Sequence, residues 1–182
     1  MRDAERCLSL IFPTPKGHAA ILYRLNPFAL LRIFLPRQNR TRLISDMEQF
    51  QYCDSGSDEK GRRVAGWIAD YFNGKIPEPT WPPWEWMDMR GLTPLQESVL
   101  KATARVPYGA VATYGEIARA IGRPKAYRFV GNTLAKNPFP IVIPCHRIIR
   151  SNDDIGGFGG GIELKRELIA LERDRARHQT LK

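Results

Sequence analysis

Short apolar runs separated by turn residues dominate the first part of the chain. These runs occupy residues 7–12, 19–24 and 29–35. Each has the length of a β-strand, and the turn cluster Pro-Thr-Pro-Lys-Gly at 13–17 separates the first two. Because the connections are short, the pattern predicts an antiparallel meander. The polar residues 37–60 predict irregular structure with a short helix near 45–50.

A helical pattern follows the meander and leads into a proline-rich segment. Apolar residues recur at i, i+3, i+4 and i+7, and they are Val64, Trp67, Ile68 and Tyr71. Asn73-Gly74 supplies a helix stop. Residues 76–92 contain four prolines and three tryptophans, which predicts an irregular linker between two domains. A stacking platform for nucleic-acid bases is the alternative role for these tryptophans.

Capping patterns mark the helices of the second half. Thr93 and Gln96 form a capping box that predicts a helix ending near Arg105. Thr113 and Glu116 form a second capping box, which predicts a short helix. Gly122 is expected to end that helix.

A third helix is predicted from Pro124 to about Lys136. Its apolar side is predicted to carry Tyr127, Val130 and Leu134. Together with the preceding short helix it forms a helix-turn-helix candidate, a motif whose second helix enters a DNA groove. Many helix pairs are structural, but the cations on this segment favour DNA binding; they are Lys125, Arg128 and Lys136.

The composition is that of a globular protein. Of the 182 residues, 43% are hydrophobic and 26% are charged, enough for one large domain or two small ones. The apolar runs are too short to span a bilayer, and the start of the chain carries charges of both signs, unlike a signal peptide. These features predict a cytoplasmic protein.

The net charge of +9 is distributed unevenly. Residues 1–90 carry 13 Lys and Arg against 11 Asp and Glu, whereas residues 91–182 carry 15 against 8. The excess in the second half favours a nucleic-acid partner there. Charge alone leaves open an ordinary basic protein with no such partner.

Three cysteines, Cys7, Cys53 and Cys145, lie far apart and have no zinc-site spacing. In a reducing compartment all three are expected to be free thiols. Cys7 and Cys53 lie among ordinary residues and are interpreted as structural or incidental.

Cys145 has neighbours of a different kind. Three prolines precede it and restrict the backbone by fixing φ; they are Pro138, Pro140 and Pro144. The apolar residues 141–143 are expected to be buried and to hold Cys145 in a preset position. His146 can take the thiol proton, and the cation Arg147 favours the thiolate, which is the nucleophile.

A base of this kind needs an orienting partner, and Glu172 is the candidate. The apolar face of the last predicted helix consists of Leu164, Leu168 and Leu171. Glu172 lies on the flank of this face, where a buried carboxylate can hold an imidazole. Taken alone, a Cys-His pair is more often structural, and such a glutamate is more often a solvated charge.

Further motifs surround Cys145. They are Val106-Pro107-Tyr108-Gly109, Thr113-Tyr114-Gly115-Glu116-Ile117-Ala118, Gly131-Asn132, Asn137-Pro138-Phe139-Pro140, Pro144-Cys145-His146-Arg147, Gly156-Gly157-Phe158, Lys165 and Leu171-Glu172. Over residues 91–175 they closely resemble the O6-alkylguanine-DNA alkyltransferases, or methylated-DNA–protein-cysteine methyltransferases. Residues 7–90 resemble that family more loosely, in strand order and in the helix end at 68–74.

The resemblance implies an α+β fold with two domains. Residues 1–90 would form a domain with a small ribonuclease-H-like sheet, followed by the linker at 76–92. Residues 91–182 would form a winged-helix-like domain that carries the helix-turn-helix and the alkyl acceptor.

The resemblance also implies roles in the reaction. Cys145 would accept the alkyl group, His146 would act as its base through water, and Glu172 would orient His146. Tyr114 would help rotate the nucleotide and donate to the base, and Asn137 would support the segment before the cysteine.

For DNA and the pocket, the resemblance implies that Arg128 fills the space left by a flipped base; a plain phosphate contact is the alternative. The other expected DNA-binding residues are Tyr114, Lys125, Thr133 and Ala135.

The expected pocket residues are Ile148, Phe158, Gly159 and Gly160, beneath a closing loop at 151–161. Arg147 is interpreted as structural, and the main-chain carbonyls of Cys145 and Ile148 would accept from the guanine amino group. Phe158 and Gly159 depart from the commoner family pattern, which leaves the preferred alkyl group open.

The implied partner is double-stranded DNA with alkylated guanine, bound through the minor groove by a monomer, without membrane, metal or cofactor. The implied reaction moves the alkyl group from O6-alkylguanine, and from O4-alkylthymine, irreversibly to Cys145.

Three alternatives are a lesion-binding relative without transfer, a winged-helix regulator and a cysteine hydrolase. The first would lack the cysteine, the second would not need the rigid segment, and the third would need an oxyanion motif that we do not find.

Overall fold

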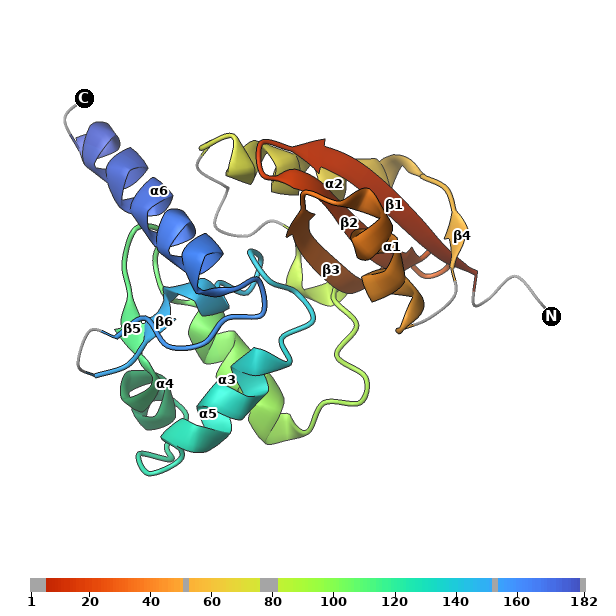
Figure 1. Cartoon of the computed structure of the whole chain (residues 1–182). Coiled ribbons are helices and arrows are strands. Elements are labelled where there is room, and N and C mark those ends of the chain that lie inside the picture. Colours follow the sequence, from red (N-terminus) through yellow and green to blue (C-terminus); the bar gives the residue numbers. More distant parts are fainter. Residues whose placement is uncertain (1–5, 51–52, 76–81, 152–153, 181–182) are drawn as a thin grey trace. The chain divides into compact units, whose positions relative to one another are not determined.

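The computed structural model describes residues 6–50, 53–75, 82–151 and 154–180 (Figure 1). The chain divides into two units, Met1–Asp88 and Met89–Lys182. Helices combine with a small sheet in an α+β fold, as the sequence predicts. The predicted boundary between residues 90 and 91 lies close to the division between the units.

A four-stranded sheet in the order β3-β2-β1-β4 forms the centre of the first unit. β1 (Cys7–Thr14) pairs antiparallel with β2 (Gly17–Arg24), which pairs antiparallel with β3 (Ala29–Arg37). This confirms the predicted meander. β4 (Asp54–Ser55) pairs parallel with β1, and the sequence did not predict it because two polar residues show no strand periodicity.

Two helices belong to this unit. α1 (Arg40–Glu48) begins earlier than predicted, because the Asn39 side chain caps it by accepting from the main-chain N–H of Arg42. α2 (Glu59–Phe72) buries Val64, Ile68 and Tyr71 of its predicted face, whereas Trp67 is half-buried. Asn73 caps the end of the helix, where the sequence predicts a stop.

Cys7 and Cys53 form a disulfide, so the prediction of free thiols is wrong for this pair. The pairing of β1 with β4 brings the two cysteines together across a separation of 46 residues. Since β4 itself was not predicted, no sequence pattern indicated this proximity. Cys145 is the free cysteine within the described part of the chain.

The predicted linker packs in part against the first unit. Residues 76–81, including Trp81, lie outside the described residues. The Trp86 ring lies edge-on to Phe28 at a centroid distance of 4.8 Å, which favours packing over the base-stacking alternative for this tryptophan. Trp84–Trp86 form the 3₁₀ helix η1, so the expectation of no regular structure is wrong there.

The second unit begins with two helices whose predicted capping boxes are confirmed. They are α3 (Pro94–Ala104) and α4 (Tyr114–Ala120). α5 (Tyr127–Ala135) begins three residues later than predicted, because a turn closed by the Ala126 N–H and the Arg123 carbonyl precedes it. Val130 and Leu134 are buried as predicted, but Tyr127 is 50% exposed, so its predicted place on the apolar side is wrong.

A short parallel pair and the last helix complete this unit. β5 (Ala112–Thr113) pairs with β6 (Ile148–Ile149), which brings the start of α4 beside the segment that follows Cys145. The buried face of α6 (Ile162–Thr180) carries Lys165, Leu168, Ile169 and Glu172. Glu172 therefore lies on the buried face itself rather than on its flank.

Candidate active site

The segment before Cys145 is held by its own hydrogen bonds. Ile141 and Ile143 are buried, as the apolar run predicts. The main-chain N–H of Ile143 donates to the Phe139 carbonyl, and the N–H of Cys145 donates to the Ile143 carbonyl, both at 2.8 Å. Ile141 adopts a φ of 75°, an uncommon conformation that these neighbouring bonds must hold. Cys145 then opens the 3₁₀ helix η2 (Cys145–Arg147) in a fixed position.

Asn137 ties this segment to the sulfur atom. Its Nδ2 donates to the Ile143 carbonyl at 2.9 Å and to Cys145 Sγ at 3.2 Å. Its Oδ1 accepts from the main-chain N–H of Phe139 at 3.0 Å. Asn137 therefore supports the segment, as expected, and also provides a donor at the nucleophile.

The environment of Cys145 acts on its acidity in opposite directions. Burial raises the pKa of the thiol, while the Asn137 donor and the charge of Lys165 act to lower it. Because burial is the largest influence, the resting sulfur is a thiol. An attack by sulfur then needs a base nearby.

His146 and Glu172 form a buried pair. The imidazole Nε2 lies 2.8 Å from Glu172 Oε1, and the two side chains are 0% and 1% exposed. Because a carboxylate can only accept, this contact assigns the proton to Nε2 and leaves Nδ1 as the basic nitrogen. Burial lowers the pKa of His146 against the opposing effect of Glu172, so a neutral imidazole is available at neutral pH.

Glu172 also joins Arg147 and the turn at Gly109. Arg147 donates to both carboxylate oxygens at 2.8 and 2.9 Å, and its Nη1 donates to the Val106 carbonyl at 2.6 Å. The main-chain N–H of Gly109 donates to Glu172 Oε2 at 3.0 Å. Burial acts to raise the pKa of Glu172, but His146 and Arg147 outweigh it and hold the pKa at about 2.

Gly109 suits this turn for two reasons. Its φ is +79°, in the region that favours glycine. An added Cβ would also lie 2.8 Å from the Ala176 Cβ. The turn can therefore approach α6 closely enough to reach Glu172.

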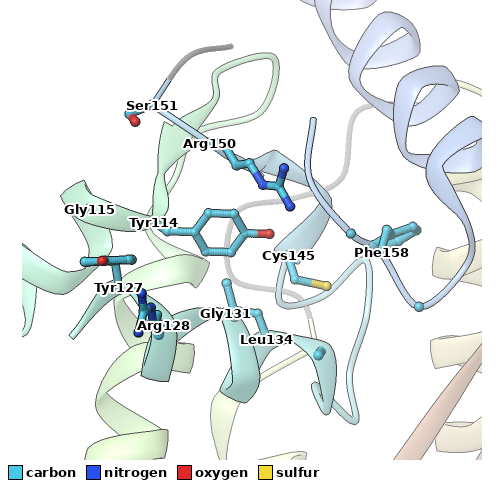
Figure 2. A pocket seen from close by; sticks show the side chains of 13 residues that line it. Tyr114, Gly115, Tyr127, Arg128, Gly131, Leu134, Cys145, Arg150, Ser151 and Phe158 are labelled. Atoms are coloured by element: carbon cyan, nitrogen blue, oxygen red, sulfur yellow. The ribbon is translucent and has the colours of Figure 1, made fainter. Parts of the chain in front are cut away.

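Tyr114 stands at the first position of α4, directly after β5. In Figure 2 its ring lies above α5 and to the left of Cys145, with its hydroxyl group directed toward Cys145 and Arg150. Burial raises the pKa of Tyr114, and the nearby Cys145 adds to this effect. The phenol is thus a protonated donor at neutral pH.

Cys145 lines a pocket of about 980 Å³, whose lining side chains are shown in Figure 2. α5 lines it with Tyr127, Arg128, Gly131, Leu134 and Ala135. The expected closing loop lines it with Ser151, Gly157, Phe158 and Gly159, and Asn152 and Asp153 of that loop lie outside the described residues. The structure thus brings Cys145, Tyr114, Arg128, Ala135, Phe158 and Gly159 to one pocket.

Four of the expected DNA-binding and pocket residues do not line the pocket. Thr133 is buried, at 5% exposed, and its expected part in DNA binding stays a prediction. Among the described residues, Ile148 and Gly160 do not line the pocket. Lys125 is exposed in the turn before α5. The Ile148 carbonyl, expected to accept from guanine, already accepts from Lys165 Nζ at 2.6 Å.

The sequence interpretation gave no role to Lys165 or Arg150. Lys165 is 0% exposed, and its Nζ also donates to the Gly157 carbonyl at 3.4 Å, so it links β6 to the loop over the pocket. Burial lowers the pKa of Lys165 to about 8. The sequence signal for a buried Lys165 was its position seven residues before Glu172, a spacing that places both residues on one helix face. Arg150 lines the pocket and pairs with Asp154 at 2.6 Å.

None of the helices in the described ranges is long and apolar enough to cross a membrane. Within the same ranges, no group of three or more His, Cys, Asp or Glu residues is arranged to hold a metal ion.

Known proteins resemble this chain in sequence and structure. The family model described as "6-O-methylguanine DNA methyltransferase, DNA binding domain" matches residues 94–174. The methylated-DNA–protein-cysteine methyltransferase of Methanosarcina barkeri is 40% identical over 119 residues, which are 64% of this chain and 70% of that relative. The protein of the same name from Haemophilus influenzae is 33% identical over 160 residues, which are 85% of this chain and 87% of that relative.

Among solved structures, the Mycobacterium tuberculosis OGT in complex with DNA matches with a TM-score of 0.70 and 32% identity. The match covers 92% of this chain and 94% of that one. Since the likeness extends over both units, and the site geometry lies inside the matched segment, the chain belongs to the methylated-DNA–protein-cysteine methyltransferase family.

Proposed function

We propose that this protein repairs alkylated DNA by moving the alkyl group from O6 of guanine, and from O4 of thymine, to the sulfur of Cys145. The observation that carries the proposal is the setting of this thiol. It lines the pocket, accepts from Asn137 at 3.2 Å, and directly precedes His146, which is paired with Glu172 at 2.8 Å. The relatives carry the name methylated-DNA–protein-cysteine methyltransferase, and the matched OGT was solved with DNA.

Activation of the sulfur begins with the neutral imidazole. His146 Nδ1 takes the thiol proton through a water molecule, and Glu172 stabilises the imidazolium that forms. Asn137 donates to the resulting thiolate, and the charge of Lys165 supports it. The base is required because burial keeps the resting thiol protonated.

The transfer is a single displacement at the alkyl carbon. The sulfur–carbon bond forms while the carbon–oxygen bond breaks, and the electron pair of the broken bond goes to the base. Tyr114 donates a proton to a ring nitrogen of the departing base, which offsets its developing negative charge. The products are an S-alkylcysteine and an unmodified base.

Access to the lesion requires the nucleotide to leave the duplex. Inside the base stack the alkyl carbon cannot meet an in-line sulfur nucleophile. The helix pair α4 and α5 would bind the minor groove, and Arg128 would fill the space that the extruded base leaves. Arg128 is exposed and lines the pocket, so its guanidinium can reach DNA without a change in the core.

The thioether product is stable, so each protein molecule acts once. The displacement itself needs no cofactor, because the thiol supplies the nucleophile and the alkylated base supplies the transferred group. The single-turnover outcome separates this proposal from a cysteine hydrolase, which would regenerate its thiol. We also propose that the protein acts as a monomer in the cytoplasm, as its sequence predicts.

The test is to mix the protein with a duplex containing one O6-methylguanine and to weigh the protein and its Cys145 peptide. We expect a gain of one methyl group on that peptide, and no gain with Cys145→Ala, which should still bind the duplex. Absence of a gain in the unsubstituted protein would favour a lesion-binding relative. A gain on another peptide would place the acceptor elsewhere.

A further inference from the structure

Tyr127 is a large aromatic side chain that is not buried in the core. The exposed large hydrophobic residues within the described ranges are Ile44, Phe50, Tyr127 and Ile162. Tyr127 alone among these four lines the pocket. An exposed aromatic group beside a binding pocket is a candidate contact for a ligand.

The position of Tyr127 on α5 defines what it faces. Tyr127, Gly131 and Leu134 are spaced at i, i+4 and i+7, so they follow one another along the helix face that forms a pocket wall. Gly131 leaves a recess in this wall, where an added Cβ would lie 3.8 Å from Tyr114 Cε1. Tyr127 stands at the first turn of the helix, at the end of the wall away from the buried Leu134.

Tyr127 is paired with the arginine assigned to the space of the extruded base. The Arg128 guanidinium carbon lies 5.9 Å from the centroid of the Tyr127 ring. Figure 2 shows both side chains together on α5, with Tyr114 lying between them and Cys145 in that view. A planar cation and an aromatic ring are the two kinds of side chain that stack on nucleobases.

We propose that the Tyr127 ring stacks on a base next to the extruded nucleotide. This inference rests on the proposed function. Extrusion exposes the faces of the two flanking base pairs, and contact with water does not replace the stacking that these faces lose. Arg128 takes the vacated space, and Tyr127 covers a flanking base at the mouth of the pocket. Tyr127 thereby stabilises the extruded state and leaves the chemistry at Cys145 unchanged.

The test compares substrates that do and do not require extrusion. Transfer is measured from an O6-benzylguanine duplex and from the free base O6-benzylguanine, for the unsubstituted protein, Tyr127→Ala and Tyr127→Phe. Tyr127→Ala should slow the duplex reaction by about tenfold, the scale of one lost base–aromatic stack. The free-base reaction should not change, and Tyr127→Phe should keep both rates because it keeps the ring. Phe50→Ala removes an equally exposed aromatic outside the pocket lining and serves as the matched control.

A second readout detects stacking directly. In a Cys145→Ala background, binding to a duplex with 2-aminopurine beside the lesion should quench its fluorescence, and adding Tyr127→Ala should remove the quenching. An unchanged duplex rate in Tyr127→Ala, an equal loss on the free base, or unchanged quenching would overturn the proposal. If the unsubstituted protein transfers from neither substrate, the proposed function fails instead, and the fluorescence of the bound duplex still decides whether Tyr127 stacks.

Discussion

The buried polar side chains next to Cys145 and the exposed polar side chains of the pocket's outer wall are held in opposite ways. The buried set, which we call the floor, includes Glu172 and Lys165, neither of which lines the pocket itself. Both bind fixed partners, and Lys165 Nζ lies 2.6 Å from the Ile148 carbonyl. At the wall, Tyr127 and Arg128 are exposed and contact each other. Buried polar groups that are fully paired hold one geometry, whereas exposed ones can exchange water for a ligand. The floor is therefore built to prepare the sulfur, and the wall to receive DNA.

This difference predicts which substrates each substitution affects. Floor substitutions should slow transfer from every substrate, including a free alkylated base. Wall substitutions should slow transfer from duplex DNA and leave the free base unaffected. If a substitution slowed both reactions but to different extents, that residue would belong to both the floor and the wall.

The largest effect is expected for Glu172→Gln. The amide cannot accept from His146, Arg147 and Gly109 together, and the buried Arg147 loses its counter-ion. Breaking a buried ion pair costs about 3–5 kcal/mol, so the free energy of unfolding should fall by about that amount. Transfer from the free base should fall at least about a hundredfold, since the base loses its orienting partner. Urea denaturation and single-turnover kinetics measure the two losses.

Acid titration supplies the check on Glu172. Its pKa is lowered from 4.5 to about 2 in the folded protein, so its contribution is complete above pH 4.5 and is lost as the pH falls toward 2. The unfolding free energy of Glu172→Gln should therefore depend less on pH over this window. The exposed Glu163 on the same helix offers Glu163→Gln as the control, which should follow the unsubstituted protein. If the unfolding free energies of all three proteins depended equally on pH, Glu172 would not be the carboxylate that stabilises the floor.

Arg128→Ala tests the wall with the next largest effect. Without the guanidinium, the space left by the extruded base has no occupant, and extrusion costs a few kcal/mol. We expect the duplex reaction to slow by about thirtyfold, equivalent to about 2 kcal/mol. The reaction with free O6-benzylguanine should be unchanged. Equal losses on both substrates would show that Arg128 does not act by filling the space left by the extruded base.

The sequence predicted the floor and the wall to different extents. Cys145, His146 and Glu172 were identified from motifs, because a Pro-Cys-His-Arg string constrains both chemistry and backbone. The contact of Asn137 with the sulfur was not foreseen, since it depends on how the segment 137–145 folds back on itself. Lys165 received no role because a lysine on a predicted helix is ordinarily solvated.

In the fold, the sequence likewise predicted features set by neighbouring residues and missed features set by contacts between residues far apart in the chain. Capping boxes predicted the starts of α3 and α4 within a residue, because caps are local. The disulfide between Cys7 and Cys53 and the parallel pair of β1 and β4 depend on contacts across more than forty residues. Tyr127 fits an apolar helix face in periodicity, but its side chain lines the pocket and is 50% exposed, whereas Val130 in the same turn of α5 is buried.

Lys165→Met tests the floor with a smaller effect. It removes the charge that supports the Cys145 thiolate and leaves the Ile148 carbonyl without this donor. Transfer from every substrate should slow by roughly tenfold, the scale of one charge-assisted hydrogen bond. The other groups that act on Lys165 are Cys145, Asp154 and Arg150.

The pH profile separates this role from a structural one. Above a pH of about 8 the unsubstituted protein loses the Lys165 charge, so the rise in rate with thiol ionisation should flatten there. Lys165→Met should lack this change in slope, while Lys101→Met, at an exposed lysine, should retain it. Identical profiles in all three proteins would assign Lys165 to packing alone.

Lys125→Ala should have the smallest effect and should act on DNA binding alone. Lys125 is exposed in the turn before α5, where a cation can contact a phosphate but not the reacting atoms. Losing one phosphate contact should weaken duplex binding about twofold and reduce the slope of log affinity against log salt by about one. Fluorescence anisotropy at several salt concentrations measures both, and the free-base reaction should be unaffected. An unchanged salt slope would mean that Lys125 faces solvent in the complex, which would confine the DNA contact to the pocket-lining residues of α5.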